Sequence, residues 1–302
     1  MKHPWPPWIT LLLLGAACAA ILAGVALYRT HATSPAALLS RLPSDGAVIV
    51  SIDFQALRRA GALGILGGTK VSQEPDYRAF VDQTSFDYVN DLDSALVSFH
   101  NTGTYFLLRG RFDWKALEEY AAHQGGNCHN TFCQVAGSMP DRKISFFPLR
   151  SDVMALAVSD NGYAADELQA IKPVQGGAIP ADPVWALIPV AALKEHAGLP
   201  PAAQALLRVL GGAQSVLVAA GPDGKRMVVR LEATCGSAAQ AAALTTELRD
   251  ITAHLRDALA TPDPADLGGV LAAGAFEQKD KQVLGRWPVE RAFLESLAGG
   301  SL

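Results

Sequence analysis

The chain has 302 residues, a formal net charge of −4 and a sequence pI near 6.0, and half of its residues are apolar. This length and composition allow a large buried core in one or two domains, and they exclude an intrinsically disordered protein. Because no extended run of Lys or Arg occurs, the electrostatic footprint of a nucleic-acid-binding protein is missing.

One long uncharged segment lies near the N-terminus. No residue from Trp8 to Tyr28 is charged, and a helix of about 21 residues spans roughly 30 Å, the thickness of the hydrocarbon core of a bilayer. Aromatic residues such as Trp8 and Tyr28 favour the headgroup regions at the two ends of such a helix. The segment predicts a transmembrane helix over residues 8–28, with a short cytoplasmic tail (1–7) before it and a linker (29–46) after it.

Two other kinds of N-terminal segment are alternatives to a transmembrane helix. A cleaved signal peptide has a shorter apolar region, of about 7–15 residues, followed by a small-residue cleavage site. A lipoprotein signal would make Cys18 the lipidated residue, but the apolar run continues beyond it as far as Leu27. We therefore expect an uncleaved anchor with the lipid bilayer as its partner, in which Cys18 packs against a helix or faces lipid.

The cysteines indicate the compartment. Cys128 and Cys133 lie five positions apart in a polar stretch between two apolar segments, a spacing typical of a small disulfide that closes a hairpin end. Two buried free thiols are an alternative, and so is a metal site that includes His129, although structural zinc usually needs a second pair of ligands. A disulfide forms in an oxidising compartment, so we expect the C-terminal body in the periplasm, held at the inner membrane. Cys235 is left as a buried free thiol.

Residues 47–171 predict a first α+β module. Its central feature is a hairpin in which residues 94–100 and 104–111 flank a turn-forming Asn-Thr-Gly. Asp113 is in position to cap the helix that follows. The other expected elements are a buried strand (47–54) and a helix after it, a helix that breaks into a turn (77–93), short strands near 131–136, 143–148 and 153–159, and a closing helix (164–171).

A Pro- and Gly-rich connector (172–183) leads to a second module over residues 184–302, in which the order of elements recurs. A strand (184–190) and broken helical pieces precede a hairpin (213–221 and 225–234) and a long helix that begins after Ser237. A late hairpin around Lys279-Asp280 and a final helix after Pro288 complete the module. The repeated order predicts two similar α+β modules with largely antiparallel sheets, for which the ferredoxin-like split β-α-β arrangement is the nearest simple description.

Three segments carry a resemblance to a known group of proteins. They are LPSDGAVIVSIDFQAL at 42–57, LLRGRFDWKAL at 107–117 and QVLGRWPVERAFLESL at 282–297. With the N-terminal anchor, they resemble uncharacterised bacterial envelope proteins that are grouped in families of unknown function. The resemblance implies an exported, membrane-anchored tandem α+β protein, and it supplies no catalytic residues.

No motif for catalysis, cofactor binding or metal binding was found. The sequence lacks a phosphate-binding glycine loop, a G-x-S-x-G elbow and an H-E-x-x-H helix. Asp87, Asp91 and Asp93 form an acidic cluster, but the glycine and the closing glutamate of a calcium loop are missing. We therefore expect no catalytic residue, cofactor or metal.

One polar cluster was expected near the first hairpin. It comprises His100, Arg109, Arg111 and Asp113, where surface ion pairing is the more common outcome and an anion site is the functional alternative. Trp114, Trp185 and Trp287 each fall on an apolar face and are predicted to lie in the core.

The sequence thus predicts a binding or assembly module that engages another envelope protein. The alternatives are an unrecognised hydrolase that uses residues such as His100 and Arg109, and an anchored subunit of a secretion or pilus machine. An open sheet edge could receive a partner strand, and a concave sheet face could receive an apolar ligand.

Overall fold

The computed structural model describes residues 35–63, 75–137, 139, 141–171, 179–194, 201–223, 226–259 and 263–299. The expected cytoplasmic tail and the expected transmembrane helix between Trp8 and Tyr28 lie outside these ranges. Within them, no helix combines the length and the apolar character needed to cross a membrane.

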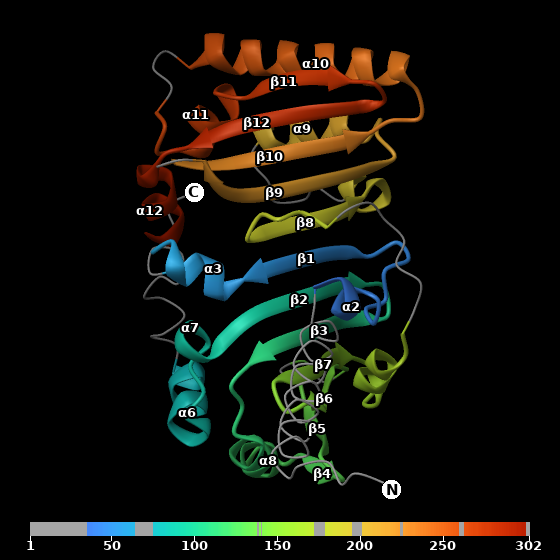
Figure 1. Ribbon diagram of the computed structural model, residues 1–302, viewed down its shortest axis with the longest axis vertical. Coiled ribbons are helices and arrows are strands. Elements are labelled where there is room, and N and C mark those ends of the chain that lie inside the picture. The colour runs from blue at the N-terminus through green and yellow to red at the C-terminus, as the bar shows by residue number, and fades with distance from the viewer. Residues whose placement is uncertain are drawn as a thin grey trace, which may run out of the picture.

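The strands differ in length and form one antiparallel sheet (Figure 1). The strand order is β11-β12-β10-β9-β8-β1-β2-β3-β7-β6-β5-β4, and every pairing is antiparallel. The bounds are β1 (Val48–Asp53), β2 (Leu92–His100), β3 (Gly103–Gly110), β4 (Asn127–His129), β5 (Phe132–Ala136), β6 (Lys143–Arg150), β7 (Val153–Ser159), β8 (Val184–Pro189), β9 (Ser215–Asp223), β10 (Arg226–Thr234), β11 (Ala275–Lys279) and β12 (Gln282–Val289).

The two halves of the chain repeat one strand order on either side of the sheet centre. The order β1-β2-β3-β7-β6 in the first half matches β8-β9-β10-β12-β11 in the second, and β1 pairs with β8 between them. The fold is therefore α+β with a large antiparallel sheet, as predicted. The ferredoxin-like description is not confirmed, because β1 pairs directly with β2 and β8 with β9, whereas the two strands that a helix joins in a split β-α-β unit have another strand between them.

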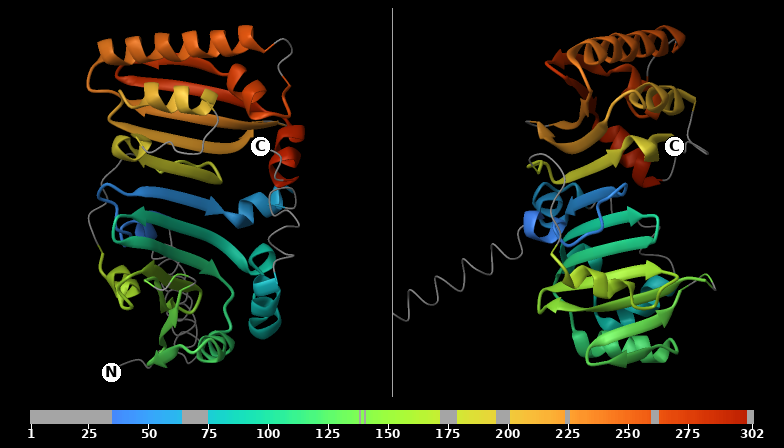
Figure 2. Two further views of the ribbon diagram at one scale, coloured as in Figure 1. Left: turned by 180° about the vertical axis from the view of Figure 1, so that it is seen from behind. Right: turned by 90° about the vertical axis from the view of Figure 1, so that its right-hand side faces the viewer.

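Helices cover the two sheet faces unequally. Since side chains of a strand alternate between faces, the core clusters show which helices lie on each side. The front face, toward the viewer in Figure 1, carries α2 and η1, and the rear face carries α6, α8, α9, α10 and α11 (Figure 2). The bounds are α2 (Pro35–Leu39), α3 (Phe54–Arg59), α6 (Pro75–Thr84), α7 (Tyr88–Asp91), α8 (Trp114–His123), η1 (Ala164–Gln169), η2 (Val190–Lys194), α9 (Pro201–Leu210), α10 (Ala238–Ala258), α11 (Leu267–Ala272) and α12 (Arg291–Gly299).

Two buried hydroxyl groups fasten the front layer to the first half of the sheet. The Ser98 hydroxyl on β2 donates to the main-chain oxygen of Pro43, just after α2, and the Ser145 hydroxyl on β6 accepts from the Ala165 amide of η1 at 3.1 Å. Both serines are fully buried, where an unpaired hydroxyl would cost roughly 1–3 kcal/mol. The pairing of both groups explains why polar residues interrupt these otherwise apolar strands.

Local sequence signals gave correct predictions in most places. Asp113 caps α8 by accepting from the Ala116 amide at 3.1 Å, and Ser237 caps α10 by accepting from the Gln240 amide at 3.2 Å. The two long hairpins form, but β9 continues to Asp223, two residues beyond the expected arm, and pairs there with Arg226. The late hairpin is displaced by one residue: Lys279 pairs with Gln282, so the turn is Asp280–Lys281 and not Lys279–Asp280. The positive φ of Asp280 (51°) explains the shift, since Asp tolerates the left-handed conformation better than Lys.

Candidate functional site

The expected polar cluster near the first hairpin is not brought together. His100 lies at the turn end of β2, where its Nδ1 bonds the Thr102 hydroxyl at 2.8 Å, whereas Arg109 pairs in the sheet with Ser94 near the other end of that strand. The Arg109 guanidinium lies 3.3 Å from Asp152. Arg111 pairs with Asp91 at 2.7 Å, and Asp113 is engaged as a helix cap. Each residue therefore has a separate local partner, and of the four only Arg109 and Arg111 form ion pairs.

The expected disulfide is present. Cys128 and Cys133 are joined at 2.03 Å and face each other across the β4–β5 hairpin. The turn between them, Asn130–Thr131, has positive φ at both residues (48° and 68°), as in a type I′ turn. Cys235 is free and buried, and burial raises the pKa of its thiol. In the described residues, no group of three or more His, Cys, Asp or Glu side chains is placed to hold a metal ion.

A cavity of about 700 Å³ lies on the rear face of the first half, between the sheet and helices α6 and α8. Four strands (β3, β5, β6 and β7) form its floor. No charged side chain occurs among the described residues that line it, and only Tyr120 and Gln124 carry polar side chains. The lining residues are Ala79, Phe80, Phe86, Leu108, Phe112, Leu117, Tyr120, Gln124, Val135, Ala136, Gly137, Ile144, Phe146, Met154 and Leu156.

Some apolar side chains around this cavity are incompletely buried, whereas Leu117, Phe146 and Met154 are buried. Leu108, Ile144 and Leu156 on the floor are only half-buried, although they lie beneath two helices. In a close-packed core, residues of this kind have neighbours on all sides. Their partial exposure is therefore exposure to the cavity, and this cavity has the size and apolar lining of a small-molecule site.

Aromatic rings form one wall of the cavity. Phe80 on α6 meets Tyr120 on α8 edge-to-face at 5.1 Å between ring centroids, and Phe86 stacks on Phe112 at 5.3 Å. Ring pairs of this geometry are rigid and strongly apolar. These ring pairs join the segments that cover the cavity on the side away from the sheet.

The cavity floor continues into a row of apolar residues across the sheet. One row of cross-strand neighbours on the rear face runs from the floor through the sheet centre to the core of the second half: Phe146, Leu156, Phe106, Val97, Val50, Ala186, Val218 and Leu231. Among the coloured elements of Figure 2 (left), no helix lies in front of β8, β1 and β2. The row is apolar throughout, although Phe146, Val97 and Leu231 within it are buried.

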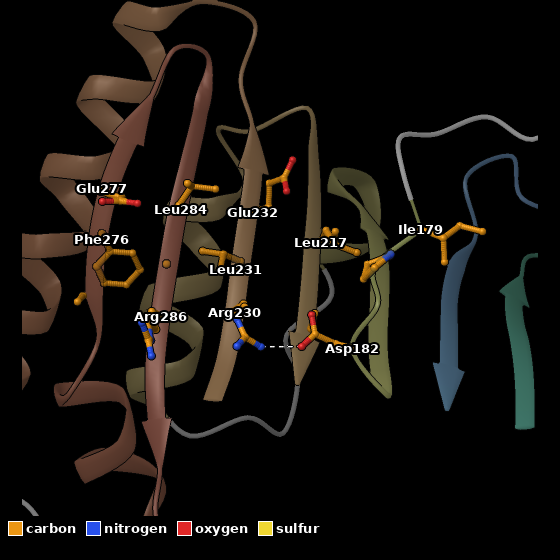
Figure 3. A pocket seen from close by; sticks show the side chains of 14 residues that line it. Ile179, Asp182, Leu217, Arg230, Leu231, Glu232, Phe276, Glu277, Leu284 and Arg286 are labelled. Carbon is orange, nitrogen blue, oxygen red and sulfur yellow. Dashed lines mark hydrogen bonds and ion pairs between the residues drawn. The ribbon is translucent and has the colours of Figure 1, made fainter. Parts of the chain in front are cut away.

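A second hollow, of about 600 Å³, lies on the front face of the second half (Figure 3). Its floor consists of two cross-strand rows. Leu217, Glu232, Leu284 and Glu277 form the first row, and Ala219, Arg230, Arg286 and Ala275 form the second. We call this hollow the front groove. No helix of the described residues covers it, and only Ile179, Pro180 and Asp182 of the connector lie against it.

One ion pair fixes the connector at the front groove, and a second joins two strands of the sheet beside it. Asp182 accepts from Arg230 at 2.6 Å, and Arg286 pairs with Asp223. Arg230 and Arg286 are direct cross-strand neighbours, an arrangement that is unfavourable for two like charges unless each has its own partner. Gly221 is required at this place, since a Cβ there would lie 2.3 Å from Asp182 Oδ1.

The two edges of the sheet are both protected. At one edge β11 is bordered by α10, and at the other β4 is only three residues long and is joined to β5 by the disulfide. Short strands and covering helices are the devices that prevent an edge from pairing with another chain. Of the two binding modes expected from sequence, the apolar hollow is therefore favoured over addition of a partner strand.

No family model matches the sequence, and no curated protein sequence is significantly similar to it. Solved structures with a similar arrangement include three crystal forms of the protein TP0453. Form IV aligns with a TM-score of 0.48 at 9% identity over 87% of this chain and 96% of that chain, and form I with a TM-score of 0.49 at 8% identity over 86% and 95%. Form III aligns with a TM-score of 0.46 at 8% identity. Similarities of this strength carry no statement about function.

Proposed function

We propose that this chain is a membrane-anchored binding module of the bacterial cell envelope, which holds an uncharged apolar ligand in the cavity beneath α6 and α8. The anchor is the uncharged segment 8–28, and the body faces the periplasm. In this proposal the two halves derive from one duplicated α+β module, and the first has an open space beneath its helices.

The cavity is the observation that carries the proposal. Its volume lies within the range of roughly 300–1,000 Å³ that small-molecule sites occupy, and its lining has no charged group to stabilise an ion removed from water. The second half provides a contrast within the same sheet. There α9, α10 and α11 pack directly on the rear face, and Val216, Leu231 and Val283 are buried.

The hydrolase alternative has less support. The residues that it requires, His100 and Arg109, lie near opposite ends of β2 and each has a separate local partner. The proposal of an anchored secretion or pilus subunit has no specific observation in its favour beyond the anchor and the α+β fold.

Photolabelling tests the ligand site. The full chain, reconstituted in lipid nanodiscs, is irradiated with an uncharged aliphatic diazirine, and the labelled peptides are identified by mass spectrometry. We expect labels on α6, α8 and β6. Leu156→Trp, which fills the floor, should remove them, whereas Val158→Trp, two residues along the same strand and face but outside the lining, should keep them. Equal labelling of both variants would refute the site.

Topology is tested separately with a single exposed cysteine. The Lys115 side chain is 86% exposed, so Lys115→Cys provides a reactive thiol on α8. A membrane-impermeant maleimide should label this variant in intact spheroplasts. Labelling only after lysis would place the body in the cytoplasm and would contradict the periplasmic assignment.

A further inference from the structure

The front groove carries more negative than positive charge. Both of its arginines are neutralised, Arg230 by Asp182 and Arg286 by Asp223. Glu232 accepts only the Gln282 side-chain amide, which carries no charge, and Glu277 has no hydrogen bond or ion pair within the described residues. Two uncompensated carboxylates therefore remain, on β10 and β11.

These carboxylates flank an apolar centre. Leu284 on β12 lies between Glu232 and Glu277 in the same cross-strand row, and Leu217 continues the row on β9 (Figure 3). Neighbouring strands are roughly 5 Å apart, so the two carboxylates are about 10 Å apart across Leu284. An occupant of this surface has to present apolar side chains in the middle and positive charges at its sides.

The first half of the chain shows what such a surface can hold. On the same face of the sheet, α2 precedes β1 and buries Leu38, Leu39 and Leu42 in the front core. The corresponding stretch before β8 includes Ile179 and Asp182, which lie against the groove and belong to no helix. The two halves share one strand order, but they differ on the front face. In the first half a short helix covers this face, and in the second half no described helix covers the front groove.

We propose that the front groove docks a short, positively charged amphipathic helix of a partner protein. Leucines of the partner pack on Leu217 and Leu284, and Lys or Arg side chains beside them pair with Glu232 and Glu277. The groove lies on the opposite face of the sheet from the apolar cavity, so this interaction is independent of ligand binding there.

The test uses two fluorescent helical peptides of about 12 residues, near the lower limit for a marginally stable helix. Both carry leucines along one face. One has lysines beside them, and the other has glutamates in their place. Binding to the full chain in zwitterionic nanodiscs is followed by fluorescence anisotropy, with empty nanodiscs as the blank. We expect the lysine peptide to bind, more weakly at high salt, and the glutamate peptide not to bind.

Matched variants assign the site. Glu232→Gln with Glu277→Gln should weaken binding of the lysine peptide roughly fivefold to tenfold, as expected for the loss of two partly exposed ion pairs. Glu247→Gln with Asp257→Asn on α10 changes the net charge equally and should have no effect. Equal weakening by both pairs would mean diffuse charge attraction, and an unchanged affinity in Leu284→Gln would exclude the groove. A dimer that Leu284→Gln dissociates would show that a second copy is the occupant. Each of these three results overturns the proposal.

Discussion

Arg249 on α10 donates two hydrogen bonds, at 3.0 and 2.7 Å, to the main-chain oxygen of Phe276 on the edge strand β11. The guanidinium thereby occupies a main-chain acceptor of the edge strand to which a strand of another chain could otherwise donate. An exposed edge is a template for pairing with another chain, and a covering helix removes it. One side chain thus links the packing of α10 to the solubility of the sheet.

Replacement of this arginine tests the role of α10 at the edge. Arg249→Met keeps the length of the side chain but removes both hydrogen bonds, so the free energy of unfolding should fall by about 1–2 kcal/mol. The variant should also self-associate at concentrations where the wild type does not, as measured by light scattering. Arg291→Met is the control, because Arg291 pairs only with Glu295 one helical turn away. Equal behaviour of the two variants would show that the edge needs no such protection.

Removal of the disulfide should have a modest effect. The Cys128–Cys133 bridge closes a loop with a sequence separation of only five residues, so loss of chain-entropy restriction accounts for about 2 kcal/mol at most. Cys128→Ser with Cys133→Ser should lower the free energy of unfolding by up to that amount, seen as a lower urea midpoint, while the fold is retained. Reductant should lower the midpoint of the wild type in the same way and leave the double variant unchanged. A midpoint insensitive to both treatments would contradict the bridge.

The turn that the disulfide closes contains an unfavourable residue. Thr131 is β-branched and has a φ of 68°, a conformation that costs a non-glycine residue roughly 1–2 kcal/mol. Thr131→Gly should therefore raise the free energy of unfolding by about 1 kcal/mol, after allowance for the greater freedom of glycine in the unfolded chain. Thr131→Ala keeps a Cβ, so it should raise the free energy of unfolding by less than Thr131→Gly does. The turn assignment would be wrong if glycine lowered the thermal midpoint.

Tyr77 should make stability depend on pH in the alkaline range. Burial, together with the hydrogen bond that the hydroxyl donates to Asp87 at 2.9 Å, raises the pKa of Tyr77 from 10 to about 12. The unfolded chain loses this proton near pH 10, whereas the folded chain keeps it until about pH 12, so the contribution to stability is complete below pH 10 and is lost between pH 10 and 12. The urea midpoint of the wild type should fall more steeply over this interval than that of Tyr77→Phe. Parallel curves would refute the assignment.

The elements that follow from short stretches of sequence were predictable. Asp113 and Ser237 cap helices because the preference for Asp and Ser at this position is local, and the 128–133 bridge follows from spacing and a turn. Trp185 and Trp287 are buried as expected. Trp114 is only half-buried, because its indole N–H reaches outward to the Ser151 main-chain oxygen at 3.1 Å.

The functional surfaces depend on long-range placement and were not predictable in the same way. The predicted polar cluster does not form, because the antiparallel pairing of β2 and β3 separates His100 from Arg109 by the length of the hairpin. The cavity arises because α6 and α8 lie over four strands that come from two parts of the chain, β3 and the successive strands β5, β6 and β7, and no local sequence pattern predicts the volume left below the helices. The one available signal was the set of aromatic residues outside the strands, Phe80, Phe86, Phe112 and Tyr120, which is more than a solvent-exposed helical layer needs.

The most direct test of the central claim is to identify what the protein carries. The full chain, its Leu156→Trp variant and its Val158→Trp variant are purified from native membranes in parallel, washed equally and denatured, and the released small molecules are quantified by mass spectrometry. The account predicts an uncharged apolar compound near one per chain in the wild type and in Val158→Trp, and its loss from Leu156→Trp. The same compounds in the same amounts from all three proteins would show that the cavity beneath α6 and α8 is not a binding site.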